Sequence, residues 1–221
     1  MAAAFVDIAQ SCAPMVQVEV LAAVVSLESK FLPFAIRINS GDPLPSQPTS
    51  KAEAIELATS LIADHRDIQI GLGGIGVEEL RKLNISVSDA FDSCRNLKAT
   101  ATLLDGYYRF ALRVGANPAQ AENVMLQSYY GRDDPTVGAM VKYDEQVRRE
   151  AKRLSPKLAS LTVAGPDDQA GPADEPRDQA NASIPRQLSH AEEPASWDVF
   201  TSRRRSSVLV FQNNDRSEQS E

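Results

Sequence analysis

The sequence predicts a mainly α-helical fold, in which a compact helical domain with a small β element precedes a disordered C-terminal tail. Three observations support this prediction. Apolar residues recur with a helical period through most of residues 15–154, strand-like alternation is limited to residues 67–71, and prolines accumulate after Leu154. With 221 residues, 43% of them hydrophobic, the chain is long enough to bury one core of ordinary domain size.

Seven helical segments are expected before the tail. Ser50 and Glu53 have the spacing of a capping box, and Asn117 followed by Pro118 is a typical helix start. The glycine and prolines within residues 31–48 favour an irregular connection there. The expected helices span residues 15–29, 51–62, 77–83, 87–91, 94–114, 118–130 and 137–154.

The composition changes after Leu154, which divides the chain into a domain of residues 1–154 and a tail of residues 155–221. The tail contains six prolines among Asp, Glu, Gln, Ala and Ser, a composition that is typical of disordered segments. Two short apolar islands, residues 197–200 and 208–211, lie near its end. Such islands in a disordered tail predict docking motifs for a partner.

Charge and residue usage exclude several classes of protein. A formal net charge of −7 argues against a nucleic-acid-binding surface. No apolar run is long enough to span a membrane, and the first residues lack the basic and apolar regions of a secretory signal. Cys12 and Cys94 are compatible with one disulfide bond or with two free thiols. Together with His65 and His190 they lack metal-ligand spacing, so neither a metal nor a cofactor is expected.

Glu28 is the strongest candidate for a functional residue. It lies three residues after Val25 and seven after Leu21, on the apolar face of the first expected helix. A carboxylate that faces a core is costly unless it is paired or protonated, and burial raises its pKa toward the range that a general acid needs. The alternative is a glutamate at a helix end that bends out to solvent. Spacing alone does not choose between the two.

Residues 71–76, Gly-Leu-Gly-Gly-Ile-Gly, match the letters of the dinucleotide-binding pattern G-x-G-x-x-G. The context disagrees, because the strand expected before them is short and polar, whereas a buried parallel strand is almost wholly apolar. No second strand of a βαβ unit follows. A tight backbone turn, at a place where side chains would obstruct a bound sugar, fits these residues better than a nucleotide site.

Three segments taken together resemble one family of enzymes. They are Glu28-Ser29 with Phe31 and residues 33–36 (Pro-Phe-Ala-Ile), the turn that begins Gly71-Leu72-Gly73, and residues 93–99 (Ser-Cys-Arg-Asn-Leu-Lys-Ala). The combination closely resembles the VirB-type lytic transglycosylases of type IV secretion systems, within the goose-type-lysozyme-like transglycosylase group. The resemblance covers about residues 10 to 150 in order, and it implies an α+β lysozyme-like fold.

The resemblance implies cleavage of the β-1,4 bond between N-acetylmuramic acid and N-acetylglucosamine in peptidoglycan. Glu28 corresponds by position to the single catalytic glutamate of the family. Protonated Glu28 would donate to the glycosidic oxygen and, once ionised, would take the proton of the muramic acid C6 hydroxyl, which closes a 1,6-anhydro ring. No water is consumed, so no second carboxylate is required. No other acidic residue stands out in a comparable apolar frame.

Further site residues follow from the resemblance. It implies substrate-binding roles for Ser29, Gly71, Leu72, Gly73, Gly74, Tyr129, Tyr130 and Tyr143. It also implies that Tyr143 lies near the catalytic glutamate, and core packing is the alternative for the three tyrosines. The family usually has Gln and Asn where this chain has Gly74 and Gly76, and an Asn within the segment that here reads Gly131-Arg132-Asp133. These departures motivate a second hypothesis, a catalytically weak peptidoglycan-binding assembly factor. A nucleotide-binding protein that uses the glycine turn is a third.

The resemblance also implies a compartment and partners. It places the protein in the periplasm, where it would open the cell wall locally for a secretion or conjugation apparatus. Its partners would be the glycan strands of peptidoglycan and other components of the type IV secretion system, with the tail as one route of contact. In that compartment Cys12 and Cys94 would be oxidised to a disulfide.

Overall fold

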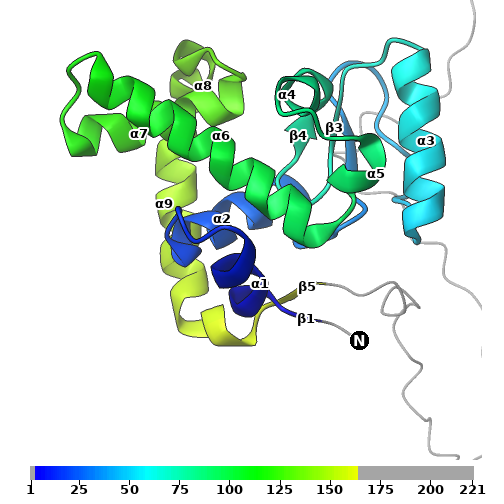
Figure 1. Cartoon of the computed structure of the whole chain (residues 1–221), viewed down its shortest axis with the longest axis horizontal. Helices are drawn as coiled ribbons and strands as arrows, with labels where there is room; N and C mark the ends of the chain where they lie inside the picture. Colours follow the sequence, from blue (N-terminus) through cyan, green and yellow to red (C-terminus); the bar gives the residue numbers. More distant parts are fainter. Residues whose placement is uncertain (1–2, 164–221) are drawn as a thin grey trace, which may run out of the picture. The chain divides into compact units, whose positions relative to one another are not determined.

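The computed structural model describes residues 3–163 (Figure 1), so the tail beyond them, with its two expected docking motifs, lies outside the described residues. The described part contains nine α-helices, a 3-10 helix and five short strands, which confirms the mainly α fold with a small β element. The helices are α1 (Phe5–Cys12), α2 (Val18–Ser29), α3 (Lys51–Ala63), α4 (Val77–Lys82), α5 (Val87–Ala90), α6 (Ser93–Arg113), α7 (Pro118–Gly131), α8 (Pro135–Met140), α9 (Tyr143–Leu154) and η1 (Ser155–Ser160). The strands are β1 (Ala3–Ala4), β2 (Ile36–Ile38), β3 (Ile68–Ile70), β4 (Ile75–Gly76) and β5 (Thr162–Val163).

The small sheet is an antiparallel meander in the order β2-β3-β4. Ile70 of β3 pairs with Ile36 on one side and with Ile75 on the other. The glycine turn therefore joins two antiparallel neighbours, whereas a dinucleotide site needs a parallel strand–helix–strand unit. This topology overturns the nucleotide-binding hypothesis.

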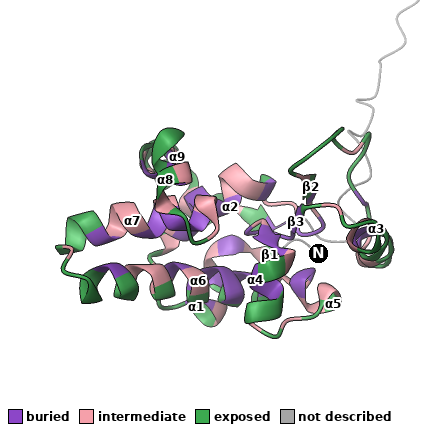
Figure 2. Ribbon diagram, turned by 90° about the horizontal axis from the view of Figure 1, so that it is seen from above, coloured by how far each residue is buried: buried purple, intermediate pink, exposed green. Residues whose placement is uncertain are grey.

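Two hydrophobic cores fill the domain, and the buried residues are purple on the ribbon in Figure 2. The helical core, between α1, α2, α6, α7 and α9, includes Leu21, Leu97 and Leu104. The sheet core lies between the strands, α3 and α5. The glycine turn lies between the two cores, because Leu72 packs in the helical core while Ile70 and Ile75 pack in the sheet core.

Side-chain caps start the helices where the sequence predicts. The Ser50 hydroxyl accepts a hydrogen bond from the Glu53 N–H at 3.2 Å at the start of α3. Asn117 and Gln120 form a reciprocal capping box at the start of α7. Asp92 caps α6, the longest helix, which contributes residues to both cores.

Four features differ from the expectations. Helix α1, which buries Phe5 completely, was not expected, and strand β2 lies within the segment predicted to be irregular. The single helix expected over residues 137–154 is broken into α8 and α9 at Lys142, whose φ is +54°. Residues 155–163, assigned to the tail, contain η1 and strand β5, which pairs with β1.

The physical reasons lie in long-range contacts. The Gln47 side chain bonds both backbone groups of Ile36, at 2.8 and 3.0 Å, and so completes the edge of β2 between prolines. Gly138 of α8 lies so close to α7 that a Cβ there would collide with the backbone of Gln127. The chain must then turn at Lys142 for α9 to pack against α2. No local pattern carries this information.

Candidate active site

Glu28 lies in the last turn of α2, and its side chain is only 3% exposed. Burial contradicts the alternative in which this glutamate bends out to solvent. The Tyr143 hydroxyl, from α9, donates a 2.6 Å hydrogen bond to Oε1 of Glu28. The Nη2 atom of Arg37, from β2, lies 2.8 Å from Oε2. Three elements far apart in the sequence thus converge on one carboxylate.

The surroundings of Glu28 act on its pKa in opposite directions. Burial raises the pKa above its usual value, while the charge of Arg37 and the hydrogen bond from Tyr143 lower it. The net direction is upward, which favours a protonated carboxyl group. Burial likewise raises the pKa of Tyr143, so its hydroxyl stays a hydrogen-bond donor at neutral pH.

Arg37 was not expected as a site residue, because it lies in the segment predicted to be irregular. Its side chain is 42% exposed and also donates to Oε1 of Gln69 on the neighbouring strand β3. This placement leaves the guanidinium accessible from the groove while one face meets Glu28. The charge of Arg37 is therefore available both to the carboxylate and to a ligand.

The glycine turn is close-packed against other parts of the protein. Gly71 and Gly74 have φ values of +75° and +63°, which favour glycine. A Cβ on Gly73 would collide with Thr100 Oγ1, and one on Gly74 would lie 2.9 Å from Oε2 of Glu28. The sequence pattern predicts that these glycines leave room for a sugar. The atoms that they accommodate are the protein's own.

Asn96 and Tyr129 hold the turn in place. Asn96, 1% exposed in α6, accepts a 2.8 Å hydrogen bond from the Gly73 N–H and donates to the carbonyl of Ala90 at 2.8 Å. The Tyr129 hydroxyl donates to the Gly73 carbonyl at 2.6 Å. Asn96 was not singled out as a site residue, although it lies in one of the segments that carried the resemblance. A polar amide on the apolar face of α6 is the signal that could have found it.

A groove of about 300 Å³ runs past Glu28, and its lining includes Ser29, Arg37, Gln47, Gln69 and Gly74. Arg37 and Gln69 also line an adjoining pocket of about 570 Å³, which extends the groove toward Tyr130 and Arg132. Within residues 3–163, no cluster of His, Cys, Asp and Glu has the geometry to hold a metal ion. None of the described helices is both long and apolar enough to cross a membrane.

The expected substrate-binding residues divide into two groups. Gly74, Gly71 and Ser29 line the groove, although the Ser29 hydroxyl donates to Val25 within its own helix, and Tyr130 lines the extension. Leu72 and Tyr129 are buried at 1% and 8% exposure and support the turn from behind. Tyr143 is also buried, where it contacts both Glu28 and the ring of Tyr130, whose centroid is 4.9 Å away.

A disulfide bond joins Cys12, the last residue of α1, to Cys94 in the first turn of α6. The two Cα atoms are 5.3 Å apart, and 82 residues separate the cysteines in sequence. The bond therefore anchors the end of α6 from which Asn96 reaches the glycine turn. It belongs to the framework of the site rather than to its groove.

Comparison with known proteins places the chain in a family. It is 39% identical over 108 residues to the type IV secretion system protein VirB1 of Brucella abortus and of Brucella suis, and the match covers 49% of this chain and 45% of each relative. It is 30% identical over 177 residues to the VirB1 protein of Agrobacterium fabrum, across 78% of this chain and 68% of that relative. The chain belongs to the VirB1 family. The match spans about half the length of the Brucella VirB1 proteins. No protein-family model and no solved structure matches the chain.

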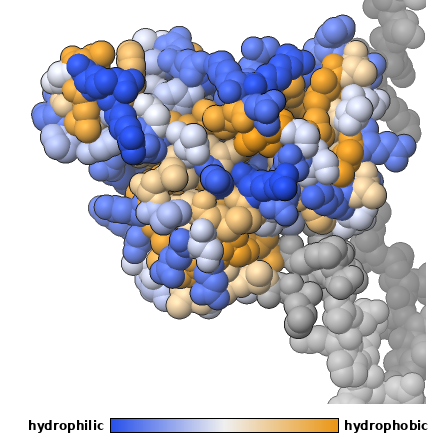
Figure 3. Space-filling model, viewed as in Figure 1, coloured by the Kyte–Doolittle hydropathy of each residue, from blue (hydrophilic) through white to orange (hydrophobic). Residues whose placement is uncertain are grey.

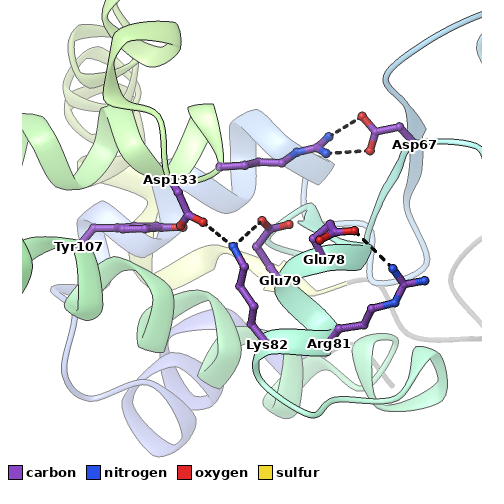
Figure 4. Close-up of polar contacts among 8 residues, drawn as sticks. Asp67, Glu78, Glu79, Arg81, Lys82, Tyr107 and Asp133 are labelled. Atoms are coloured by element: carbon purple, nitrogen blue, oxygen red, sulfur yellow. Dashed lines mark hydrogen bonds and ion pairs between the residues drawn. The ribbon is translucent and has the colours of Figure 1, made fainter.

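Two positions that depart from the VirB-type pattern have clear partners (Figure 4). Arg132 forms a bidentate ion pair with Asp67, in which Nη1 and Nη2 donate to the two carboxylate oxygens at 2.7 and 3.1 Å. Asp133 accepts a 2.7 Å hydrogen bond from Tyr107 and pairs with Lys82. These contacts tie the end of α7 to β3, α4 and α6. Residues 131–133, which follow Tyr129 and Tyr130, thus support the groove in this VirB1-family chain.

Two further acidic residues are buried in the described part of the chain, although neither lies in an apolar stretch of sequence. Glu79 of α4 is 4% exposed and Asp144 of α9 is 8% exposed. Asp144 accepts hydrogen bonds from Gln127 and Arg148, at 3.0 and 2.9 Å. Glu79 has no such partners. It lies beside the glycine turn, so it belongs to the surroundings of the site.

Proposed function

We propose that the chain is a peptidoglycan lytic transglycosylase. The observation that carries the proposal is the buried carboxylate of Glu28, raised in pKa, at the wall of a groove and held between Tyr143 and Arg37. A raised pKa favours the protonated carboxyl group that general-acid cleavage of a glycosidic bond requires. The substrate class, N-acetylmuramic acid linked β-1,4 to N-acetylglucosamine, follows from family membership together with the positional match of Glu28.

The mechanism uses Glu28 twice. Protonated Glu28 donates to the glycosidic oxygen as positive charge develops at the anomeric carbon, and the carboxylate that results is stabilised by the charge of Arg37 and the hydrogen bond from Tyr143. Ionised Glu28 then takes the proton of the muramic acid C6 hydroxyl. That oxygen attacks the anomeric carbon, closes the 1,6-anhydro ring and restores the acid.

The cellular role rests on the relatives. The Brucella proteins are named as type IV secretion system proteins, and we infer that this chain is likewise a component of such a system. In that role it works in the periplasm, binds glycan strands and opens the wall locally while other components assemble. The tail is a candidate for contact with those components.

The test is mass spectrometry of peptidoglycan digests. Wild-type protein is expected to release 1,6-anhydro products, and Glu28→Gln to lower this release by about 10²-fold or more while keeping the fold. Glu19→Gln is the matched control, because Glu19 is exposed on the same helix. Undiminished release by Glu28→Gln would reject the proposal.

One observation favours a second candidate, a catalytically weak peptidoglycan-binding assembly factor. The turn presents no side chain at Gly74, where the family usually has a Gln that contacts substrate, or at Gly76, where the family usually has an Asn. This candidate predicts that wild-type protein sediments with purified peptidoglycan but releases no anhydro product. Turnover by the wild type would reject it.

A further inference from the structure

Glu79 is a buried acid on a short helix, α4, that also buries Leu80 and exposes its other charged residues. Its neighbours on α4, Glu78 and Arg81, have side chains that are 71% and 67% exposed, and the surface over this helix is hydrophilic (Figure 3). The side chain of Glu79 is only 6% exposed. The ammonium of Lys82 forms a long ion pair with Oε1 at 3.9 Å and a closer one with Asp133 (Figure 4). Local sequence gives no reason for this burial.

The unpartnered oxygen of Glu79 has one counterpart. Among the described residues, two buried side-chain polar atoms make no hydrogen bond: Oε2 of Glu28, which is paired with the guanidinium of Arg37 at 2.8 Å, and Oε2 of Glu79, which has no such ion pair. Each faces one glycine of the turn, because a Cβ on Gly74 would lie 2.9 Å from the first and a Cβ on Gly76 would collide with the second. Buried oxygens without donors destabilise a fold, so such atoms call for an explanation. A shared role beside the turn explains both.

The space beside Glu79 adjoins the groove of Glu28, because the two share lining residues. A side pocket of about 10 Å³, roughly the room for one hydroxyl group, is lined by Gln69, Gly74, Gly76, Glu79, Tyr107 and Arg132 among others. It shares Gln69 and Gly74 with the groove at Glu28, and Arg132 with the extension of that groove. A chain lying in the groove therefore passes the mouth of this pocket.

Among the polar side chains that line the pocket, Glu79 and Arg132 form an acceptor and donor pair. Glu79 Oε2 accepts, and the guanidinium of Arg132, fixed by its ion pair with Asp67, donates. A Cβ on Gly76 would meet both side chains, since Nε of Arg132 would lie 3.5 Å from it. A hydroxyl group both donates and accepts, so it suits this pair.

We propose that Glu79 is a substrate-contacting residue that accepts a hydrogen bond from a saccharide hydroxyl in this side pocket. In this role Glu79 and Arg132 replace the polar side chains that the turn lacks at positions 74 and 76. The inference rests on the proposed function, because it assumes a glycan of N-acetylated hexosamines in the groove. It extends that function by adding a subsite that residues of α4 and α7 build.

The test is titration of the full chain with the β-1,4-linked tetramer of N-acetylglucosamine, in a Glu28→Gln background that prevents turnover. Adding Glu79→Ala is expected to weaken Kd by about 10-fold or more, because it removes a hydrogen bond to a charged acceptor. Adding Glu79→Gln keeps one acceptor oxygen and should weaken Kd less. The matched control is Glu78→Ala, the exposed neighbour on the same helix, which should leave Kd unchanged.

Thermal melting separates this role from a structural one. If Oε2 of Glu79 serves the substrate and makes no hydrogen bond within the protein, Glu79→Gln should not lower Tm. A lower Tm with unchanged Kd would overturn the inference, and so would equal Kd values for the parent and a folded Glu79→Ala variant. If the Glu28→Gln parent itself fails to bind the tetramer, the proposed function fails together with the subsite.

Discussion

The hydroxyl of Tyr143 donates a 2.6 Å hydrogen bond to Oε1 of Glu28, across 115 residues of sequence. This contact fixes the acid between α2 and α9, and it lowers the pKa that burial raises. It also makes the position of the last described α-helix a direct determinant of the chemistry.

Replacing Tyr143 with Phe tests this contact. Loss of the hydrogen bond raises the pKa of Glu28, and cleavage needs protonated Glu28, so the alkaline limb of the kcat/KM profile should move to higher pH. The maximum should fall by about 10-fold, since the ionised form loses a stabilising donor. Rates of release of anhydro products across pH measure both effects. Tyr108→Phe, on α6, is the control. If the alkaline limb of the kcat/KM profile does not move in Tyr143→Phe, the role given to Tyr143 is contradicted.

Replacing Glu28 with Gln should stabilise the protein at neutral pH. Because burial holds the folded-state pKa above the ordinary value of 4.5, the folded state binds more protons than the unfolded state between those two pKa values. Stability from this group is fully present below the unfolded pKa and is lost as pH rises through the folded pKa. Gln does not titrate, so the Tm gain should be near zero at about pH 4 and positive at about pH 7.5. A gain that does not depend on pH would contradict the assignment.

Restoring the family's Gln at position 74 should fail to improve activity. Gly74 has a φ of +63°, and a side chain there meets the Glu28 carboxylate at 2.9 Å. Gly74→Gln is therefore expected to cost about 1–2 kcal/mol of stability from backbone strain alone, and to lower the release of anhydro products. Gly106→Ala is a control, since no atom lies within 4 Å of a Cβ at that exposed position of α6. Higher activity of Gly74→Gln would show that the turn can rearrange.

Removing the disulfide should weaken the fold without changing the groove. Cys12→Ser with Cys94→Ser opens a loop of 82 residues, which costs roughly 4 kcal/mol in the chain-entropy model. Urea unfolding of oxidised, reduced and double-variant protein measures the loss. The reduced wild type should match the variant, and equal stability of all three would argue against the bond.

Part of the site could be predicted from local pattern. Apolar periodicity in α2 placed Glu28 on the apolar face but left open whether its side chain is buried, and Asn117 with Pro118 was enough to start α7. Both depend on spacing within one element. The resemblance then supplied Tyr143, which no spacing rule connects to Glu28.

The remaining site residues depend on long-range geometry. Arg37 lies on a three-residue strand that exists because it pairs with β3 and with the side chain of Gln47. Glu79 has charged neighbours on a six-residue helix, and only the packing of that helix beside the glycine turn buries it. The break at Lys142 likewise follows from the close contact of α8 with α7.

The pairing of β1 with β5 has a mechanical consequence. In antiparallel register Ala3 lies opposite Val163, so the described chain enters and leaves the domain at one point. Tension between the two chain ends would separate this strand pair one residue at a time, at low force, before it reached the helical core. Tension between residue 163 and a glycan held in the groove would instead load the whole domain. Attachment of the protein through residue 3 or through residue 163 would therefore hold the domain at the same point.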